Sequence, residues 1–430
     1  MKSTAQIIKF ALPAVMENFL QMLIGFVDTF LVAHIGLAAI SAVTVAGTVI
    51  LIYQALFIAL GSMISSLVAK QWAEKRDTAL FEHSALKLTL LIGLGLGLFT
   101  LLAASPMLTL FGAEGSVHQL ALLYLLLVGG FILLLALMTS LSAISRAHGN
   151  TRLPMWASLT TNGVNIALAA LFIFIFHWGV AGAAMATVFA RLIGTALLFV
   201  SLQRRLNIHF RLSALIKTPV SRKLVRQALP AAGERLFMRL GDLLLFILIL
   251  SFGNAVYAGN AIGESITQFI YMTGFGLATV TVVLVAEQFG MQNRALIARL
   301  IRQTFWLSAL SMGVISGSLW YFSSVLSGFF TSDRTAIAAS NTVILYSFIA
   351  SFFVAGTLTY TAAFQAIGKP KLPFWATTLG VLFFRLAVGF LFGIFFRQGL
   401  AGVQLAIILD NIFRFIFLKL SWQNAFQKLP

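Results

Sequence analysis

The sequence predicts an all-α polytopic membrane protein whose twelve transmembrane helices form two six-helix, pseudo-symmetric lobes. Hydrophobic residues make up 60% of the 430 residues and charged residues only 10%, whereas soluble domains carry about 25% charged residues. The chain also repeats itself at a nearly constant offset. Ala11-Leu12-Pro13 matches Ala228-Leu229-Pro230, and Gly179-Val180-Ala181-Gly182 matches Gly399-Leu400-Ala401-Gly402. Internal duplication in a membrane protein is typical of transporters built from two halves.

Each predicted helix rests on an apolar segment of sufficient length, since a helix needs roughly 20 apolar residues to cross a bilayer. The uncharged stretch 153–190 is too long for one helix, and we divide it at His177-Trp178-Gly179. The expected spans are about 7–35, 39–69, 87–111, 118–146, 153–176, 181–203, 224–252, 256–289, 297–329, 335–367, 372–395 and 400–422.

The basic residues indicate the topology. Of the 29 lysines and arginines, 23 lie in loops or helix ends on one predicted side of the membrane, among them Arg146 and Arg414, and only Arg334 and Arg397 lie on the other. The positive-inside rule places the basic side, with both termini, in the cytoplasm. The net charge of +17 is therefore explained by topology, and we expect no nucleic-acid partner.

Six spans in each half give the two lobes the same orientation in the membrane. We expect an N-lobe at residues 1–203 (helices 1–6), a basic cytoplasmic linker at 204–223 and a C-lobe at 224–430 (helices 7–12). The first apolar segment carries Glu17 and Asp28 and does not resemble a cleavable signal peptide. The absence of cysteine excludes disulfides and thiolate metal sites.

Acidic residues inside the spans are the first candidates for function, because a charge in the bilayer is costly unless it faces protein or water. There are six: Glu17, Asp28, Glu234, Asp242, Glu264 and Asp410. Glu17 and Asp28 share one face of the first span, where no Lys or Arg occurs between Phe10 and Gly36. We expect Asp28, and Glu17 nearer the cytoplasm, to exchange the coupling ion. The alternative is a structural carboxylate that caps a neighbouring helix or bonds a Ser or Thr.

The acids of the second half have basic neighbours. Arg239 and Asp242 are spaced for an i, i+3 ion pair, and Asp410 and Arg414 for an i, i+4 pair. We expect structural pairing at both places, with Asp242 also a candidate for substrate binding. Glu234 and Glu264 are expected to bind a cation or to relay protons.

The fifth span carries Asn162 and Asn165 on one face. Amides inside a membrane commonly hold helices together, but they are also good neutral ligands for a cation or a carboxylate. Both interpretations remain open. We place Asn162 in the substrate site and Asn165 in the ion site.

Several motifs resemble those of the multidrug and toxic compound extrusion (MATE) family in its bacterial, DinF-like form. They are Pro13…Val27-Asp28-Thr29-Phe30…Gly36, Asn162…Asn165-Ile166 leading to Gly182–Thr187, Leu229-Pro230-Ala231…Arg239-Leu240-Gly241, and Gly274-Phe275-Gly276…Gln288. The twelve spans in two six-helix lobes extend this resemblance over the whole chain. The resemblance implies an antiporter that takes up H⁺ or Na⁺ while it expels amphipathic, often cationic drugs.

The resemblance also implies site residues. Asp28 matches the acid of the family's first helix, and Asn165 and Thr187 match its polar N-lobe cluster. A second acid of many members is replaced by Ala169, which favours H⁺ over Na⁺ as the coupling ion. Glu234 and Glu264 resemble acids of some bacterial members.

The predicted function is cation-coupled efflux, with H⁺ the expected ion and Na⁺ the alternative, of amphipathic and mostly cationic organic compounds by alternating access. The protein is expected to be a monomer in the cytoplasmic (inner) membrane of a prokaryote, in contact with the lipid bilayer and without cofactor or bound metal. A lipid-linked oligosaccharide flippase of the same superfamily is the alternative. It is disfavoured because the spans hold six acids against four arginines. An enzyme is not expected, since no metal cluster, nucleophile elbow or Walker A lysine occurs.

Overall fold

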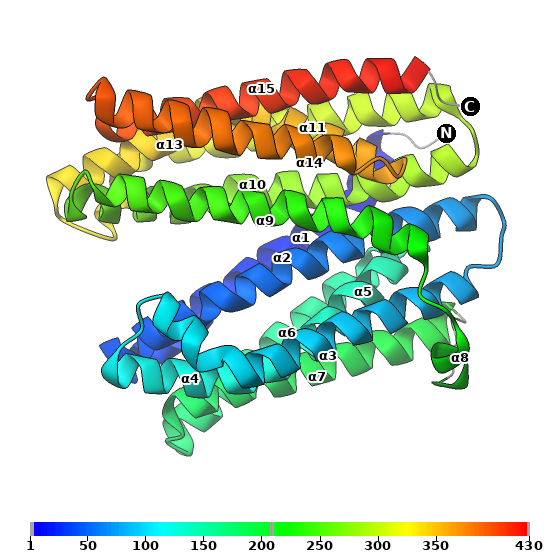
Figure 1. Cartoon of the computed structure of the whole chain (residues 1–430), viewed down its shortest axis with the longest axis horizontal. Helices are drawn as coiled ribbons and strands as arrows, with labels where there is room; N and C mark the ends of the chain where they lie inside the picture. The colour runs from blue at the N-terminus through cyan, green and yellow to red at the C-terminus, as the bar shows by residue number, and fades with distance from the viewer. Residues whose placement is uncertain (1–3, 207, 209, 211, 428–430) are drawn as a thin grey trace. The chain divides into compact units, whose positions relative to one another are not determined.

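The computed structural model describes residues 4–427 except 207, 209 and 211, and it leaves out the side chains of residues 4, 21–29, 33 and 212. Every regular element in this described part is helical (Figure 1). The first half contains α1 (Thr4–Ala33), α2 (Leu37–Ala73), α3 (Ala79–Leu110), α4 (Gly115–Gly130), α5 (Leu133–Ala147), α6 (Arg152–Ala170), η1 (Leu171–Ile175), α7 (Gly179–Leu206) and the short α8 (Leu212–Lys217). The second contains α9 (Arg222–Leu250), α10 (Asn254–Gly290), α11 (Arg294–Tyr321), α12 (Ser323–Gly328), α13 (Arg334–Ala366), α14 (Lys371–Leu379), η2 (Gly380–Val388), η3 (Leu391–Phe395) and α15 (Gly399–Gln427).

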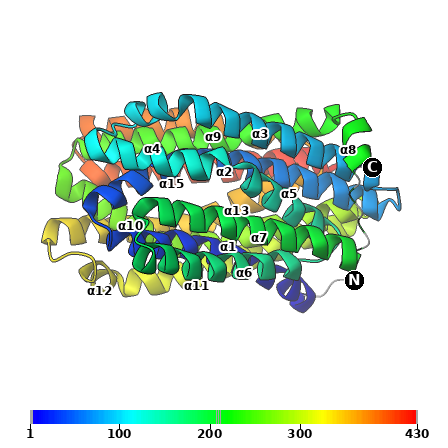
Figure 2. The same cartoon turned by 90° about the horizontal axis from the view of Figure 1, so that it is seen from below.

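The helices form two compact units. The N-terminal unit comprises Met16–Arg226, and the C-terminal unit comprises Gln227–Pro430 together with Met1–Val15. The long helices within each unit run roughly parallel or antiparallel to one another (Figure 2). The start of α1 packs in the C-terminal unit, where Gly276 of α10 lies so close to Val15 that an added Cβ would come within 2.6 Å of it.

Twelve helical segments of the described chain are long enough to cross a membrane, which is the number that the sequence predicts. Eight helical spans in the described chain are long and apolar enough by themselves, and the bent pair α4–α5 makes a ninth. Three further helices, α1, α9 and α11, have 30, 29 and 28 residues. At 1.5 Å per residue each is longer than the roughly 30 Å hydrocarbon core. Helix α9 is less apolar because it carries the acids and arginines that the sequence singled out.

The backbone repeats with the sequence. Helices α2 and α10 both have 37 residues, and each follows a glycine with positive φ, Gly36 (138°) and Gly253 (106°). The π-helical stretches η1 and η3 also begin at positions that the repeat superposes, and both have 5 residues. Beyond them, Gly182 and Gly402 approach the backbone of the preceding helix so closely that an added Cβ would lie 3.1 Å and 2.7 Å from the carbonyl carbons of Phe172 and Phe392.

Three predicted spans differ in detail from the structure. The fourth is bent by 42° between α4 and α5, directly after Gly129-Gly130, and paired small residues are a common cause of a kink. The ninth ends at Tyr321, and the separate helix α12 follows. The eleventh changes from α14 into the π-helical η2 and η3.

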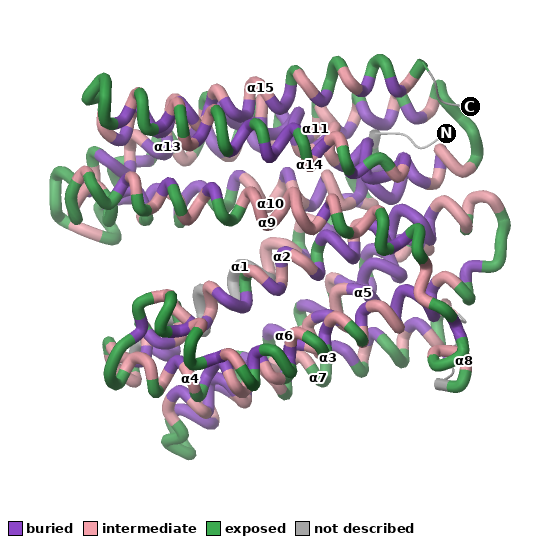
Figure 3. The backbone as a smooth tube through the Cα atoms, viewed as in Figure 1, coloured by how far each residue is buried: buried purple, intermediate pink, exposed green. Residues whose placement is uncertain are grey.

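Apolar packing holds each unit together. In the N-terminal unit the buried core includes many alanines, whose small size lets membrane helices approach closely. In the C-terminal unit α10 is the most completely buried of the spanning helices, with 61% of its most apolar stretch buried. Helix α15 alternates between buried and exposed turns along its length (Figure 3). One face of α15 therefore packs against the rest of the unit, and this buried face carries Asp410 and Arg414.

Candidate cation and substrate site

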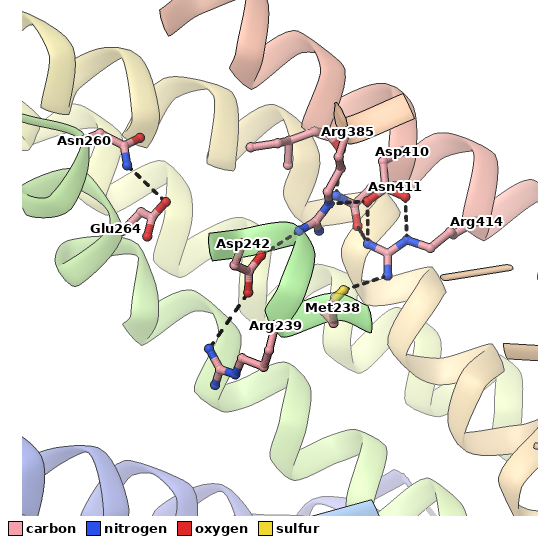
Figure 4. Close-up of polar contacts among 10 residues, drawn as sticks. Met238, Arg239, Asp242, Asn260, Glu264, Arg385, Asp410, Asn411 and Arg414 are labelled. Carbon is pink, nitrogen blue, oxygen red and sulfur yellow. Dashed lines mark hydrogen bonds and ion pairs between the residues drawn. The ribbon is translucent and has the colours of Figure 1, made fainter. Parts of the chain in front are cut away.

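A chain of alternating charges lies between α9, η2 and α15 of the C-terminal unit (Figure 4). Asp410 is fully buried and accepts hydrogen bonds from Arg385 Nε at 2.5 Å and Arg414 Nη2 at 2.9 Å. Arg385 also donates through Nη1 to Asp242 Oδ1 at 2.8 Å. Each buried charge therefore has an opposite charge in hydrogen-bonding contact, which is the condition for burying it at tolerable cost.

A glycine on the neighbouring helix leaves space for the carboxylate of Asp410. Gly380, the first residue of η2, faces its carboxylate, and a Cβ at Gly380 would collide with Asp410 Oδ1. Arg414 follows Asp410 by one turn of α15 and also contacts Asn411 Oδ1 at 3.0 Å and Met238 Sδ at 3.4 Å. The i, i+4 pair predicted for Asp410 and Arg414 is confirmed, at 2.9 Å between Asp410 Oδ1 and Arg414 Nε.

One end of the charge chain is open. The side chains of Asp242 and Arg239 are 35% and 48% exposed, whereas that of Arg385 is 8% exposed. A charge inside a spanning helix faces protein or water rather than lipid, so we infer that this end meets water. The predicted pair of Arg239 and Asp242 is present at 3.9 Å, but Arg385 is the closer partner.

Glu264 of α10 has a different environment. Its Oε1 accepts a hydrogen bond from Asn260 Nδ2 at 3.2 Å, and Asn260 Oδ1 in turn accepts one from Gln404 Nε2 at 3.2 Å. The carboxylate forms no ion pair with another described residue. Because its hydrogen bond comes from a neutral amide and not from a cation, Glu264 stays a candidate for binding a proton or a cation.

Glu17 and Glu234 occupy equivalent places in the two repeats but have different partners. Glu17 is buried and receives two hydrogen bonds from Arg146 Nη1, at 3.0 and 2.9 Å. Glu234 instead receives one from the amide of Gln365 at 3.4 Å. Gln365 occupies the position of Arg146 in the second repeat, because Gly149 matches Gly368. The same pair of positions thus holds an ion pair in one unit and a carboxylate–amide contact in the other.

The predicted polar residues of the N-terminal unit are buried in neighbouring helices. Asn162 of α6 donates to the carbonyl oxygen of Leu20 in α1 at 2.7 Å, and its own Oδ1 is buried without a hydrogen bond from any described residue. Asn165 is 2% exposed, and Thr187 of α7 donates to Ala183 O at 3.0 Å. The side chain of Asp28 lies outside the described residues.

Comparison with known proteins identifies the family. The MatE family matches residues 13–171 and again 230–391. The two matches begin at Pro13 and Pro230, which are the two prolines that the internal repeat superposes. The chain belongs to the MatE family. This agrees with the resemblance in the sequence, and it makes the protein a membrane transporter rather than an enzyme.

Relatives of the MatE chain match it over nearly its whole length. It is 29% identical to the probable multidrug resistance protein NorM of Thermotoga maritima, over 97% of this chain and 93% of the relative. It is 24% identical to the multidrug export protein MepA of Staphylococcus aureus, over 93% and 89%.

Solved structures share the fold. One is described as the outward-facing conformation of a multidrug resistance MATE family transporter of the MOP superfamily. It has a TM-score of 0.89 and 21% identity, covering 98% of this chain and 96% of that one. Another is a MOP superfamily transporter from Pyrococcus furiosus, described as having a binding pocket of reverse polarity. It has a TM-score of 0.88 and 20% identity over the same shares. The twelve-helix fold is thereby confirmed.

Two expectations for this MatE protein need correction. Glu17 does have a basic partner, because Arg146 arrives from α5, 129 residues further along the chain. We predicted that Arg146 and Arg414 lie on the cytoplasmic side. Both are instead buried in ion pairs with acids of the spanning helices, Arg146 with Glu17 and Arg414 with Asp410. Since six arginines then stand against six acids, the predicted excess of acids in the spans is wrong.

The sequence identified the acids inside the spans but not the residues that contact them. Arg385 looked like an isolated arginine in the eleventh span, and Gln365, Asn260 and Gln404 carried no signal by themselves. The internal repeat is the signal that was available for Gln365, because it places this residue opposite Glu234 as Arg146 is placed opposite Glu17.

Proposed function

We propose that this MatE protein is a multidrug efflux antiporter that exports amphipathic, mostly cationic organic compounds in exchange for protons. Alternating access of the two lobes, at 1–203 and 224–430 with the linker 204–223, moves the cargo. Its relatives NorM and MepA are named a probable multidrug resistance protein and a multidrug export protein, which supports small organic molecules as cargo.

The observation that carries this proposal is the state of Glu234 and Glu264. Both lie inside spanning helices, and both carboxylates accept a hydrogen bond from a neutral amide, that of Gln365 or Asn260. Arg235 and Arg414 lie near Glu234 but form no ion pair with it. The acids paired with arginine have their charge satisfied within the protein. Glu234 and Glu264 can instead exchange a proton for an organic cation, with Asp242 of the same unit as a further substrate-binding residue. Asn162 of the N-terminal unit is a separate candidate for substrate binding.

Protons suit the ion site better than sodium does. Sodium loses water on binding and needs several oxygen ligands with negative charge among them. The proposed N-lobe site offers the carboxylate of Asp28, with Asn165 and Thr187 as neutral oxygens, while Ala169 is buried and apolar. Glu17 belongs to this site in sequence, but its charge is already satisfied by Arg146, so we assign it a supporting role.

The flippase alternative has less support. Such a protein needs cations in its cavity that are free to hold pyrophosphate. Arg385 and Arg414 are instead buried on Asp410, and Arg146 on Glu17. Among the arginines paired with Asp242 and Asp410, only Arg239 has a side chain that is about half exposed. A single cation is a weak site for a diphosphate.

Transport in proteoliposomes tests the proposal. An inward pH gradient alone should drive export of a fluorescent organic cation, and one pH unit supports roughly tenfold accumulation. Glu264→Gln should abolish coupled export, while Glu114→Gln, at an exposed loop acid, should leave it unchanged. Transport driven by a sodium gradient, and lost in sodium-free buffer despite a pH gradient, would overturn proton coupling. Preferential movement of a lipid-linked sugar would instead favour the flippase.

A further inference from the structure

A groove of about 340 Å³ opens on the C-terminal unit between α11, α13 and α15, away from the acids discussed above. Its walls are mostly aromatic: Phe305 of α11 stacks on Phe415 of α15 with ring centroids 5.8 Å apart, and Tyr360 and Trp422 are among the other lining residues. Gly356 of α13 leaves room for the Phe415 ring, because a Cβ there would collide with it. The groove is therefore built by packing, and its volume falls at the lower end of the range for ligand sites.

Two basic side chains line this groove. Arg302 of α11 and Lys419 of α15 are exposed and line it, and Lys419 Nζ lies 5.6 Å from the centre of the Phe415 ring. Neither forms an ion pair with another described residue, and no acid lines the groove. The groove thus combines an apolar floor with two positive charges that the protein does not neutralise.

The position along the helices is that of a membrane interface. Arg302 follows the first residue of α11 by eight positions, and Lys419 precedes the last residue of α15 by eight. At 1.5 Å per residue both lie about 12 Å from the helix ends. Tyr360, six residues before the end of α13, is about 9 Å from its own. Aromatic and basic side chains at this depth are typical of the border between headgroups and acyl chains.

We propose that the groove binds one glycerophospholipid with a negatively charged headgroup. An acyl chain lies against Phe305, Phe415 and Trp422, and the headgroup phosphate contacts Arg302 and Lys419. Charge complementarity selects this ligand, since basic pockets between helices near the cytoplasmic face bind anionic headgroups. The site is separate from the proposed transport acids, so it does not depend on the proposed function.

Native mass spectrometry of the purified full-length protein tests the proposal, with phosphatidylglycerol and phosphatidylcholine of identical acyl chains as probes. The wild type should bind one phosphatidylglycerol more tightly than phosphatidylcholine. Each cation should account for about a fivefold preference, which corresponds to about 1 kcal/mol per cation. Arg302→Gln with Lys419→Gln should remove this preference without lowering the unfolding temperature.

The matched control is Lys369→Gln with Lys371→Gln, which removes two exposed charges from the same end of the unit but outside the groove. This control should keep the preference for phosphatidylglycerol. Equal binding of the two lipids by the wild type, or an equal loss in the control, would overturn the proposal. Displacement of the bound lipid by millimolar inorganic phosphate would overturn it too, since it would point to a simple anion site. Phe305→Leu should weaken both lipids equally, because it shortens the apolar floor and leaves the contact between Lys419 and Phe415 in place.

Discussion

At the scale of single residues, the two repeats use the same glutamate in different ways. Glu17 is fixed by two charge-assisted hydrogen bonds from Arg146, whereas Glu234 accepts a hydrogen bond from the neutral amide of Gln365. Charge-assisted bonds are roughly twice as strong as neutral ones. Glu17 is therefore held in a buried ion pair, whereas Glu234 forms no ion pair with another described residue.

Giving Glu234 an arginine partner should hold it in an ion pair like that of Glu17. We predict that Gln365→Arg pairs with Glu234 as Arg146 pairs with Glu17, and lowers proton-driven transport about tenfold or more while the protein stays folded. Transport in proteoliposomes and the unfolding temperature measure the two effects. Gln365→Met is the control for side-chain volume without a charge and should be less severe. Undiminished transport in Gln365→Arg would show that the charge of Glu234 is not used.

Removing the partner of Glu17 should act on stability instead. Arg146→Met leaves a buried carboxylate without its cation, which costs about 3–5 kcal/mol. The double variant Glu17→Gln/Arg146→Met should recover most of that loss, because no charge then stays unpaired. Unfolding in detergent measures both variants. A single variant that is no less stable than the double variant would contradict the structural role of the pair.

Sequence reasoning found the charged residues but not all their contacts. The pairs Asp410–Arg414 and Arg239–Asp242 were predicted because partners on one helix are a fixed number of residues apart. Arg146 and Arg385 meet acids that lie 129 and 143 residues away in the chain. No spacing rule reaches that far, and only the packing of the helices brings these atoms together.

At the scale of helices, the packing of Gly380 against Asp410 can be tested directly. Alanine favours a helix over glycine by about 1 kcal/mol, so a glycine kept here indicates a need for space. We predict that Gly380→Ala displaces the Asp410 carboxylate and destabilises the protein by about 1–3 kcal/mol. Gly313→Ala in α11 is the matched control, because nothing lies within 4 Å of its added Cβ. Equal effects of the two substitutions in thermal unfolding would contradict the argument.

Helix positions were largely predictable, while irregularities within helices were not. Long apolar segments placed the spans because a bilayer demands a minimum length. The bend between α4 and α5 and the π-helical turns of η2 depend on which neighbours press against a segment. Gly97, for example, lies so close to Gly130 that an added Cβ would come within 2.7 Å of its carbonyl oxygen, and this contact between α3 and α4 cannot be read from either helix alone.

At the scale of the whole molecule, the duplication and the charge asymmetry together predict the topology. We expect both termini and the linker 204–223 to lie in the cytoplasm. The chain has no cysteine, so single cysteines can be introduced without background. A cysteine at Ser213 should react only with a membrane-permeant reagent in intact cells, and one at Ser116 with an impermeant reagent as well. Both positions are exposed, and labelling of both after solubilisation is the control. Labelling of both from the same side would refute this topology.

The π-helical stretch η2 lies where the two halves of the chain differ in length. Trp156 matches Trp375 and Gly179 matches Gly399, so the second half is longer by a single position between these points. The stretch η2, which has no counterpart within α6, lies there. One extra residue in an α-helix rotates everything after it by about 100°, whereas a wide turn absorbs it. The wide turns of η2 therefore accommodate the one-residue difference in length between the two halves. Arg385 reaches the carboxylates of Asp242 and Asp410 from this same stretch.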